Sequence, residues 1–550
     1  MMILLLMVFV LCMGMPMPGI ADCGAVHSMY VPRQLSYNPI LENALIYNKK
    51  NRKVNRPSHA MHSSLETEID ARSLPLVLSH SEIEKRIESA DAQSVDPAQP
   101  ERIESADAES IGSAQPKSHS YEKVKAKSYS DSYDWNYLFS VKPIYTQTIS
   151  KSLKKYFNIN HKACMQVRED GTGDIDSLWL QTISSDPTFY SSTLSFSPVS
   201  KTGGVLLFFQ AQLPHELSVS VDTAVVHVSN DMRLLETNIT NLGTSEFQTV
   251  TQEFASPINC FGRVCCARGK TGLDDIQVKL MYNLSDCDEH HFDVYGLLGI
   301  PTGAGSKSRY LFEPLVGSKH VQLGLGATGM GMVCDTGCST LSLQGELKWR
   351  YGFAGKEIRS FDLTKNGQWS RYMLLVKRTD LVTMLPAINS LTFKSSVTPR
   401  NSVDLYFAAH YNYNAWHAEV GYDFWYRSPE HVCIKNCNSV LSTFGIADLL
   451  GIALLNPHTA STANISQSVA AGANQMVSDT TFVGLTTADI NPASGAAPRS
   501  MSNCVYASVG YELDCHEYPM ELGLNVAYEK GTNNNKADTV SGWLSFDIYI

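Results

Sequence analysis

The chain has 550 residues, which is too long for one small domain, although a large β-barrel can reach this length as a single unit. Its net charge of −10 is spread along the sequence and provides no basic field, which argues against nucleic acid as the main partner. Charged residues make up only 18%, low for a soluble protein, and the wealth of aromatic and hydroxyl residues favours β-structure.

The N-terminal sequence predicts export. Its first residues, MMILLLMVFVLCMGMPMPGIADC, form an apolar run that breaks at prolines before a small-residue site. We therefore predict a secretory signal peptide over residues 1–21, cleaved after Ala21. We do not expect a lipid on Cys23, because Asp22 directly precedes it. No later run reaches the roughly 20 apolar residues that a transmembrane helix needs, so we expect no helical anchor.

Residues 22–133 differ in character from the rest of the chain. They are polar, and RIESADAQSVDPAQP at Arg86 recurs as RIESADAESIGSAQP at Arg102. Few large apolar side chains are available there to offset the entropy lost on ordering. This segment is therefore predicted to be a disordered or partly helical extension.

From about residue 134 apolar and polar side chains alternate with a period of two. The clearest case is VDLYFAAHYNYNAWHAEVGYDFWYRS, which starts at Val403 and contains a short NYN turn. A strand of this kind has one face in an apolar medium and the other in a polar medium. The pattern predicts about 14 strands. They span residues 134–148, 174–184, 187–198, 203–213, 217–228, 276–284, 291–300, 320–333, 341–353, 402–411, 416–427, 503–513, 519–530 and 541–550.

The predicted connections are sorted by length. Short ones alternate with long ones, and the long ones span residues 149–173, 229–275, 301–319, 354–401 and 428–502. A soluble β-sandwich gives no reason for this asymmetry, whereas membrane barrels have short turns at one end and long loops at the other. The fold class is therefore predicted as all-β, with a transmembrane antiparallel β-barrel over residues 134–550 and long outer loops.

The signal region, the alternating strands and the final strand SGWLSFDIYI together resemble porin-type outer-membrane β-barrels of Gram-negative bacteria. FDVYGLLGIPTG, followed by LFEPLVGSKHVQLGLG, is also similar to paired strands of such barrels. The resemblance implies location in the bacterial outer membrane, contact with its lipid, and recognition of the last strand by the barrel assembly machinery. That strand ends here on Ile550, where the class usually has Phe or Trp.

In a barrel, the polar residues of each strand would face the lumen. The candidates carry both signs, with carboxylates more common, which predicts a mild preference for cations. The alternative is that these groups are merely hydrated or paired. The candidates are Glu346, Lys348, Arg350, Asp404, His410, His417, Glu419, Asp423, Glu512, Glu521, Glu529 and Asp547.

The sequence contains 13 cysteines, which in an exported protein predict disulfides. We expect them within each end of the barrel, with Cys433, Cys437, Cys334 and Cys338 as the candidates. Cross-linking between molecules is the alternative. The three-residue spacing within each of these pairs lacks the tight zinc-knuckle pattern, so we predict no metal site and no cofactor.

The favoured function is a porin-like channel for passive diffusion of small hydrophilic solutes or ions. Apolar segments in loops 354–401 and 428–502 are expected to fold inward as a constriction. The alternative is a surface-exposed structural or adhesin-type barrel, cross-linked by disulfides in one form. No Gly-x-Ser-x-Gly motif occurs, and no serine is suitably placed beside His410 and His417, so we predict no enzyme. A homo-oligomer is left open.

Overall fold

The computed structural model describes residues 137–550, with gaps at 150–151, 169–170, 181–189, 242–248, 288, 337, 436, 448–462, 468–481, 514–517 and 533–534. The predicted signal peptide (1–21) and the whole of the predicted extension (22–133), including its internal repeat, therefore lie outside the described residues. Among the residues that are described, no helix is long and apolar enough to cross a membrane.

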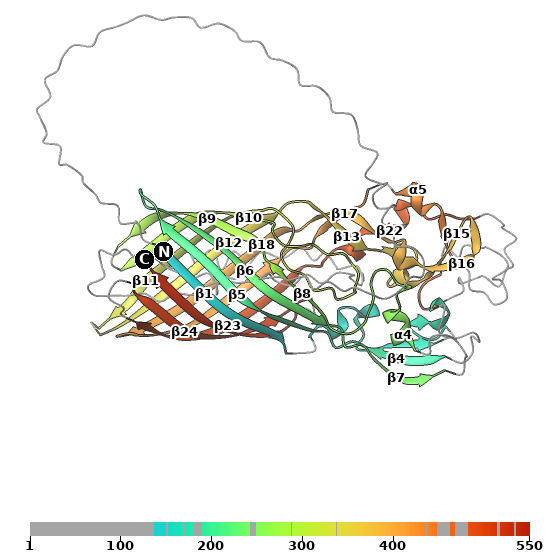
Figure 1. Cartoon of the computed structure of the whole chain (residues 1–550), viewed down its shortest axis with the longest axis horizontal. Helices are drawn as coiled ribbons and strands as arrows, with labels where there is room; N and C mark the ends of the chain where they lie inside the picture. The colour runs from blue at the N-terminus through green and yellow to red at the C-terminus, as the bar shows by residue number, and fades with distance from the viewer. Residues whose placement is uncertain are drawn as a thin grey trace, which may run out of the picture. The chain divides into compact units, whose positions relative to one another are not determined.

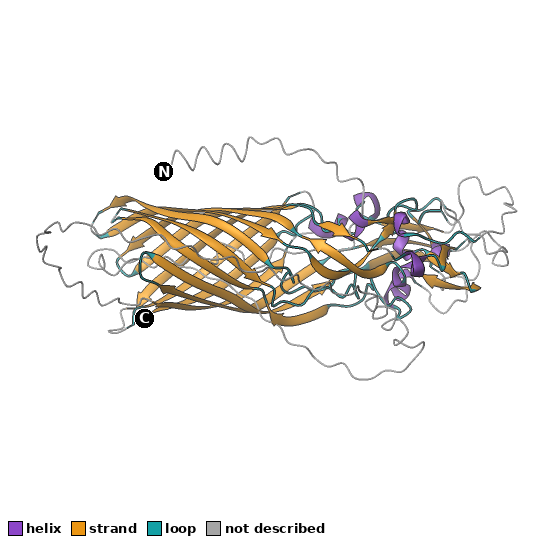
Figure 2. Ribbon diagram, turned by 90° about the horizontal axis from the view of Figure 1, so that it is seen from above, coloured by secondary structure: helices purple, strands orange, loops and turns teal. Residues whose placement is uncertain are grey.

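The main element is a closed antiparallel β-barrel (Figures 1 and 2). A 13-stranded sheet closes through the pairing of β5 with β6, which leaves β8 outside a barrel of twelve strands. In chain order these are β1 (Tyr137–Thr148), β5 (Val199–Gln212), β6 (Leu217–Asp231), β9 (Ile276–Asp286), β10 (His290–Ile300), β11 (Gln322–Asp335), β12 (Ser339–Gly352), β18 (Arg400–Tyr413), β19 (Trp416–Arg427), β23 (Ser500–Leu513), β24 (Met520–Gly531) and β25 (Thr539–Tyr549).

The barrel class is confirmed, but the predicted count of about 14 strands is wrong. The predicted strands at 174–184 and 187–198 are not part of the barrel. Residues 175–176 and 191–195 instead form short strands of a separate four-stranded sheet. Alternation of apolar and polar residues indicates only that the two faces of a strand have different surroundings. The side chains of the 191–195 strand point alternately into the core of the outer loops and away from it, so this strand alternates without being part of the barrel. As a result, the first long connection runs from 149 to 198, and residues 199–202, which lie between two of the predicted strands, belong to β5.

The barrel closes through the last strand. β25 pairs antiparallel with β1, with Leu138 opposite Tyr549 and Thr148 opposite Thr539. Tyr137 and Ile550 exchange two backbone hydrogen bonds of 2.8 and 2.9 Å, so the pairing extends to the final residue. No sheet edge is left open at this seam, which is what a membrane-spanning sheet requires.

The connections are sorted by length as predicted. Short turns of a few residues join the strands at one end of the barrel, whereas the long connections lie at the other end. There they fold into a lobe of short strands and helices, which we call the outer lobe (Figure 2). Its elements are η3 (Ser152–Lys155), η4 (Ile159–His161), β2 (Met165–Arg168), β3 (Ile175–Asp176), η5 (Ser177–Trp179), β4 (Ser191–Ser195), β7 (Leu235–Thr240), α4 (Val250–Ala255), β8 (Arg268–Leu273), β13 (Gly355–Ser360), β14 (Asp362–Leu363), η7 (Ser370–Tyr372), β15 (Leu374–Lys377), β16 (Asp380–Pro386), η8 (Ala387–Asn389), β17 (Thr392–Thr398), β20 (His431–Cys433), α5 (Asn438–Leu441), β21 (Phe444–Ile446), η10 (Thr487–Asp489), β22 (Ile490–Asn491) and η11 (Pro492–Gly495).

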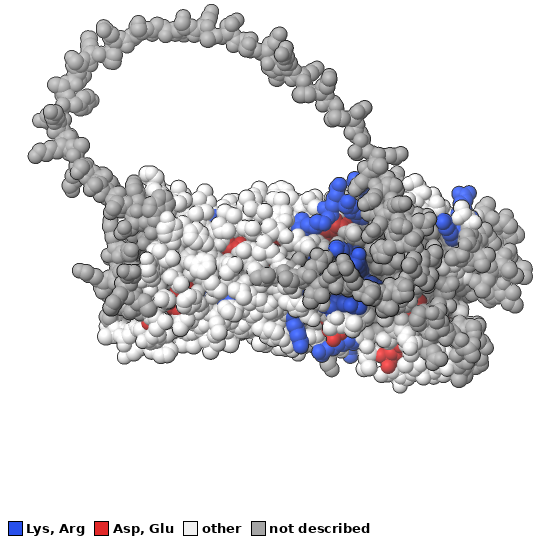
Figure 3. All heavy atoms as spheres, in the orientation of Figure 1, with Lys and Arg blue, Asp and Glu red and all other residues white. Residues whose placement is uncertain are grey.

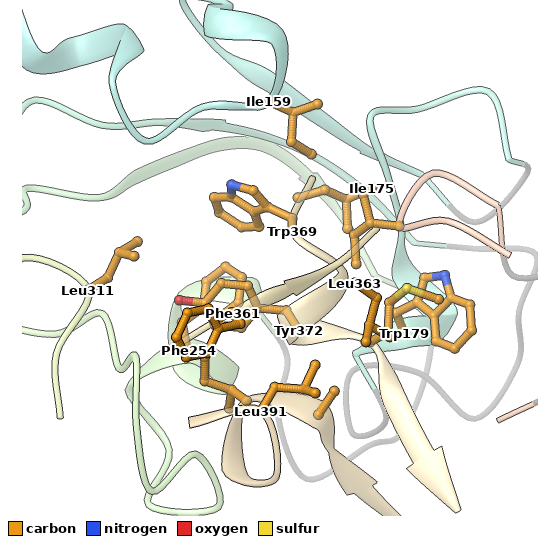
Figure 4. Packing of buried hydrophobic residues seen from close by; sticks show 14 of the residues in the cluster. Ile159, Ile175, Trp179, Phe254, Leu311, Phe361, Leu363, Trp369, Tyr372 and Leu391 are labelled. Atoms are coloured by element: carbon orange, nitrogen blue, oxygen red, sulfur yellow. The ribbon is translucent and has the colours of Figure 1, made fainter. Parts of the chain in front are cut away.

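A single hydrophobic core holds the outer lobe together (Figure 4). Trp369 packs against Phe196, Phe254 and Tyr372, with ring centroids 5.1–6.1 Å apart. These rings come from three different connections, and the Trp369 indole also donates a 2.9 Å hydrogen bond to the Phe157 carbonyl. The long loops therefore fold as one unit.

The apolar loop segments predicted to constrict the lumen lie in this core instead. Ile388 and Leu391 of the 354–401 loop, and Phe444 and Ile446 of the 428–502 loop, are buried members of the lobe cluster. The apolar segment of the 428–502 loop continues through residues 448–455, which lie outside the described residues. Apolar loop residues gain more by sharing a core with one another than by entering a lumen lined with charge.

A pair of buried aspartates fastens the lobe to the barrel rim. Asp274 and Asp275 separate β8 from β9, and both strands pair with β6. The Asp275 carboxylate accepts hydrogen bonds from the backbone N–H groups of Gly303 (3.2 Å) and Ser318 (2.8 Å), and from the Ser318 hydroxyl. The loop between β10 and β11 is thereby fixed against the outer end of β9.

The outside of the barrel carries few charged side chains, as the mostly white wall in Figure 3 shows. Leu325, Val420, Leu544 and other outward residues are exposed, whereas their neighbours in sequence face inward. Exposed aromatic residues form two girdles. Those near the short turns are Phe139, Phe209, Tyr282, Tyr411, Tyr413, Trp416, Tyr511 and Tyr518, and those near the outer lobe are Tyr145, Trp349, Phe353 and Tyr528. An apolar band between aromatic girdles is typical of barrels that cross a membrane.

Candidate functional site

The inward face of the barrel carries the charged groups that the sequence singled out. All twelve candidates lie on this face, because each alternates with exposed apolar neighbours or stands opposite an inward residue. Ten of them are buried, and Glu512 and Glu529 are partly exposed. The ten buried candidates are Glu346, Lys348, Arg350, Asp404, His410, His417, Glu419, Asp423, Glu521 and Asp547.

Many of these charges form pairs inside the barrel. Arg350 of β12 contacts Asp404 of β18 at 2.6 Å between guanidinium and carboxylate. His410 lies 3.0 Å from the Glu419 carboxylate on the next strand, and Gln344 contacts its other ring nitrogen at 2.7 Å. Pairing of this kind is what buried charges require, since an ion taken out of water without a partner is strongly destabilising.

Some contacts skip a strand, and three of them cross a glycine. The Tyr295 ring of β10 lies over Gly326 of β11 and its hydroxyl donates to Glu346 of β12. A Cβ on Gly326 would stand 2.2 Å from this ring. Glu346 also lies 3.8 Å from the Lys279 ammonium of β9. The missing side chain at Gly326 is therefore what lets the tyrosine reach along the wall.

The same arrangement recurs twice on the other side of the barrel. The Tyr506 ring of β23 lies over Gly421 of β19 and reaches the Tyr406 hydroxyl of β18, which also donates to Glu419. His417 of β19 lies over Gly510 of β23 and contacts the Glu521 carboxylate of β24 at 2.9 Å. A Cβ on Gly510 would stand 2.0 Å from His417 Nε2. We call these three arrangements the glycine bridges.

Lys142 is the main inward charge that sequence reasoning missed. It lies on β1, is fully buried, and has the carboxylates of Asp547, Glu521 and Glu419 as its charged surroundings. Among the residues that the structure describes, neither Lys142 Nζ nor the Asp547 carboxylate oxygens have a hydrogen-bond partner. The rule of alternation would have found Lys142, since Leu138, Ser140 and Lys142 share one face of β1. The glycine bridges had no signal in the sequence, because they depend on which strands are neighbours.

None of the described cysteines forms a disulfide with another described cysteine. Cys334 and Cys338 lie at the short-turn end, and Cys433 and Cys437 lie in the outer lobe, as expected. Their pairing stays a prediction. Cys504 is the one described cysteine that is buried, and it faces the lumen from β23. Within the described residues, no three His, Cys, Asp or Glu side chains are grouped so that they would hold a metal ion.

A second ionic cluster lies in the outer lobe. Arg359 of β13 contacts Glu357 and Glu430, each at 3.0 Å, and donates to the Gly495 carbonyl at 3.1 Å. His320 contacts the other oxygen of Glu357 at 2.6 Å. All four charged side chains are buried, and they come from three different connections. The cluster thus joins three loops at the base of the lobe.

The electrostatics of this cluster favour the charged form of Glu357. Burial pushes the pKa of this carboxyl upward, but Arg359 and His320 outweigh burial and lower the pKa to about 2. Burial also acts to lower the pKa of Arg359, and the two carboxylates Glu357 and Glu430 raise it above its usual value. Arg359 is therefore a permanent cation in the lobe.

Comparison with known proteins gives only distant likenesses. No family model matches the chain, and no curated protein does. An outer-membrane channel from Pseudomonas putida F1 is similar at 9% identity and a TM-score of 0.31, over 75% of this chain and 94% of that one. The transport unit of the autotransporter AIDA-I from Escherichia coli has 8% identity and a TM-score of 0.25, over 78% of this chain and 92% of that one. A Pseudomonas aeruginosa FadL homologue has 8% identity and a TM-score of 0.25, over 76% and 89%.

Likenesses of this size carry no argument about function, and the geometry itself assigns the class. A closed antiparallel barrel with no open edge, apolar between two aromatic girdles and ionic within, is suited to span a lipid bilayer. The chain is therefore a β-barrel of the outer-membrane type. Barrels of this type generally have their short turns at the periplasmic side and their long loops at the cell surface.

Replacing Gly421 by alanine should destabilise the barrel. The new methyl group would stand 2.2 Å from the Tyr506 ring, so the ring must leave its position beside Tyr406. Overpacking of this kind costs about 1–3 kcal/mol. We expect a lower midpoint for the heat-induced mobility shift of the folded barrel on SDS gels. Gly296→Ala is the matched control, because a Cβ at Gly296 meets nothing within 4 Å. Equal midpoints for the two variants would contradict the role of the bridge.

The outer lobe should lose stability in acid. Because the folded pKa of Glu357 is lowered to about 2 from an ordinary value of 4.5, its contribution is complete above about pH 4.5 and disappears as the pH falls through 2. We expect Glu357→Gln to flatten this dependence and to cost about 3–5 kcal/mol at neutral pH, since Arg359 loses one of its charged partners. Hydrogen exchange of the β13 and β17 amides measures the effect. Glu216→Gln, at an exposed turn, is the control, and an unchanged acid profile in Glu357→Gln would refute the assignment.

Proposed function

We propose that the barrel serves to hold the folded outer lobe at the cell surface, with a lumen closed to free diffusion. The observation that carries this proposal is the burial of inward side chains along the barrel. Asp547 near the short turns, Glu346 in the middle and Arg350 near the outer lobe are each at most 3% exposed. Side chains that line an open aqueous pore would be in contact with solvent.

The outer lobe supports the same function. Its loops share a core of aromatic side chains around Trp369 and a buried ionic cluster around Arg359. Loops that merely connect strands need no common core, and a core of this kind holds a defined surface in place. The protein would then be a surface-exposed structural or adhesin-type barrel.

The position of the thiols is compatible with a cross-linked form of such a layer. Cys164, Cys266 and Cys433 are exposed in the outer lobe, and Cys287, Cys334 and Cys338 are exposed at the short-turn end. Exposed thiols in an oxidising compartment are open to oxidation between molecules. Cross-linked multimers and a homo-oligomer are therefore part of this proposal.

A porin-like channel that opens from this closed state is the second candidate. Lys142 and Asp547 support it, because they are ionisable groups that face the lumen and have no hydrogen-bond partner among the residues that the structure describes. In an open state they would be solvated by water or by a small hydrophilic solute, and the excess of carboxylates would favour cations. A catalytic role for the lumen histidines gains no support, since His410 and His417 contact carboxylates and an amide rather than a nucleophile.

Reconstitution of the full chain in a planar bilayer separates the two candidates. A closed barrel should give no steps of conductance across a wide range of voltage. Steps in the wild-type protein would refute the closed-barrel proposal and favour the channel. Insertion must be checked in the same membranes by protease protection, with cleavage in the outer lobe and protection of β18 and β19.

A further inference from the structure

Exposed basic residues gather at the boundary between the barrel and the outer lobe. Figure 3 shows Lys and Arg in a band beside the white barrel wall. Several lie at the outer ends of barrel strands that are spread around the circumference. Lys201 is near the outer end of β5, Lys319 precedes β11, and Lys530 is at the outer end of β24. Lys356 of β13 and Arg268 of β8 are exposed at the same end.

Two of these lysines continue the outward, membrane-facing rows of their strands, and Lys319 lies just before the start of a third strand. Lys530 follows Tyr528 by two residues, and Lys319 precedes Val321 by two. Lys201 stands opposite Gln147, two residues beyond Tyr145 on β1. Tyr528, Val321 and Tyr145 are all exposed on the apolar outside of the barrel. Since residues two apart on a strand share a face, Lys201 and Lys530 lie on the outside, directly after the apolar rows end. Lys319 lies just before β11 in a left-handed backbone conformation (φ 59°), and its side chain is exposed at the same end of the barrel.

The opposite end of the barrel has the reverse charge. The exposed charged residues of its described turns and adjoining strand ends include Glu216, Asp286, Glu289 and Asp335, and no exposed Lys or Arg is found among the described residues there. In addition, Lys201, Lys319 and Lys530 form no ion pair with any described residue. Scattered lysines that served only solubility would have no reason to sit at one end and to continue the membrane-facing rows.

We propose that Lys201, Lys319 and Lys530, supported by Lys356 and Arg268, form a basic rim that binds the phosphate groups of anionic lipids in the outer leaflet. A lysine directly beyond an apolar row can lay its methylene stem along the lipid and place its ammonium group at the level of the headgroups. Phosphate oxygens at that level are charged acceptors for such donors. The rim would fix both the depth and the orientation of the barrel in an asymmetric membrane.

The test is lipid binding by the purified full chain in uncharged detergent at low salt. We expect a diphosphorylated glycolipid to bind and to raise the midpoint of heat-induced unfolding, and phosphatidylcholine at the same concentration to have no effect. The triple variant Lys201→Gln, Lys319→Gln, Lys530→Gln should bind the glycolipid about 100-fold more weakly, because each lysine near an anionic surface contributes roughly fivefold. High salt should weaken wild-type binding.

A control variant removes the same charge from the outer lobe. Lys155→Gln, Lys365→Gln, Lys435→Gln changes three lobe lysines and should bind the glycolipid like the wild type. If the rim variant folds poorly, Lys530→Gln alone should show a loss of about fivefold. Equal glycolipid binding by the rim variants and the wild type would overturn the proposal. So would equally tight binding of inorganic phosphate, which would assign the rim to free anions.

Discussion

The proposed closure of the lumen depends on the glycine bridges. A strand lines the lumen with every second residue, so large side chains on neighbouring strands would normally stand side by side and point into water. Where the intervening strand carries a glycine, the side chain lies flat along the wall and reaches the next strand but one. Tyr295, Tyr506 and His417 all do this, and two of the three contact a carboxylate. Buried charges are thereby paired without a ligand or a metal ion.

The outer lobe follows from a related constraint. Connections this long contain apolar segments, and such segments need cover when they lie outside the membrane. These loop segments pack against one another around Trp369 and do not enter the lumen with its charged side chains. The buried groups Arg359 and Asp275 then fix the lobe where it meets the barrel. The barrel therefore buries charged side chains in ion pairs, whereas the lobe buries apolar side chains in an aromatic core.

Much of the barrel could be predicted from the sequence, because its signal is local. In SGWLSFDIYI, alternation placed Leu544 outside and Asp547 inside, and the structure has the first exposed and the second fully buried. The same local rule failed at 191–195, since a short strand of the lobe has two unlike faces as well. The glycine bridges and the shared core of the loops could not be predicted from the sequence. They depend on contacts such as Tyr406 with Tyr506, which are 100 residues apart in the sequence.

The closed lumen can be tested most directly with a thiol that the chain already carries. Cys504 faces the lumen from β23 and is 3% exposed, whereas Cys433 in the outer lobe is exposed. The measurement is the rate at which a small maleimide modifies each cysteine in the folded, membrane-inserted protein, read by mass spectrometry of the peptides. A closed lumen predicts rapid modification of Cys433 and modification of Cys504 only after unfolding. Modification of Cys504 in the folded barrel at a rate close to that of Cys433 would contradict it.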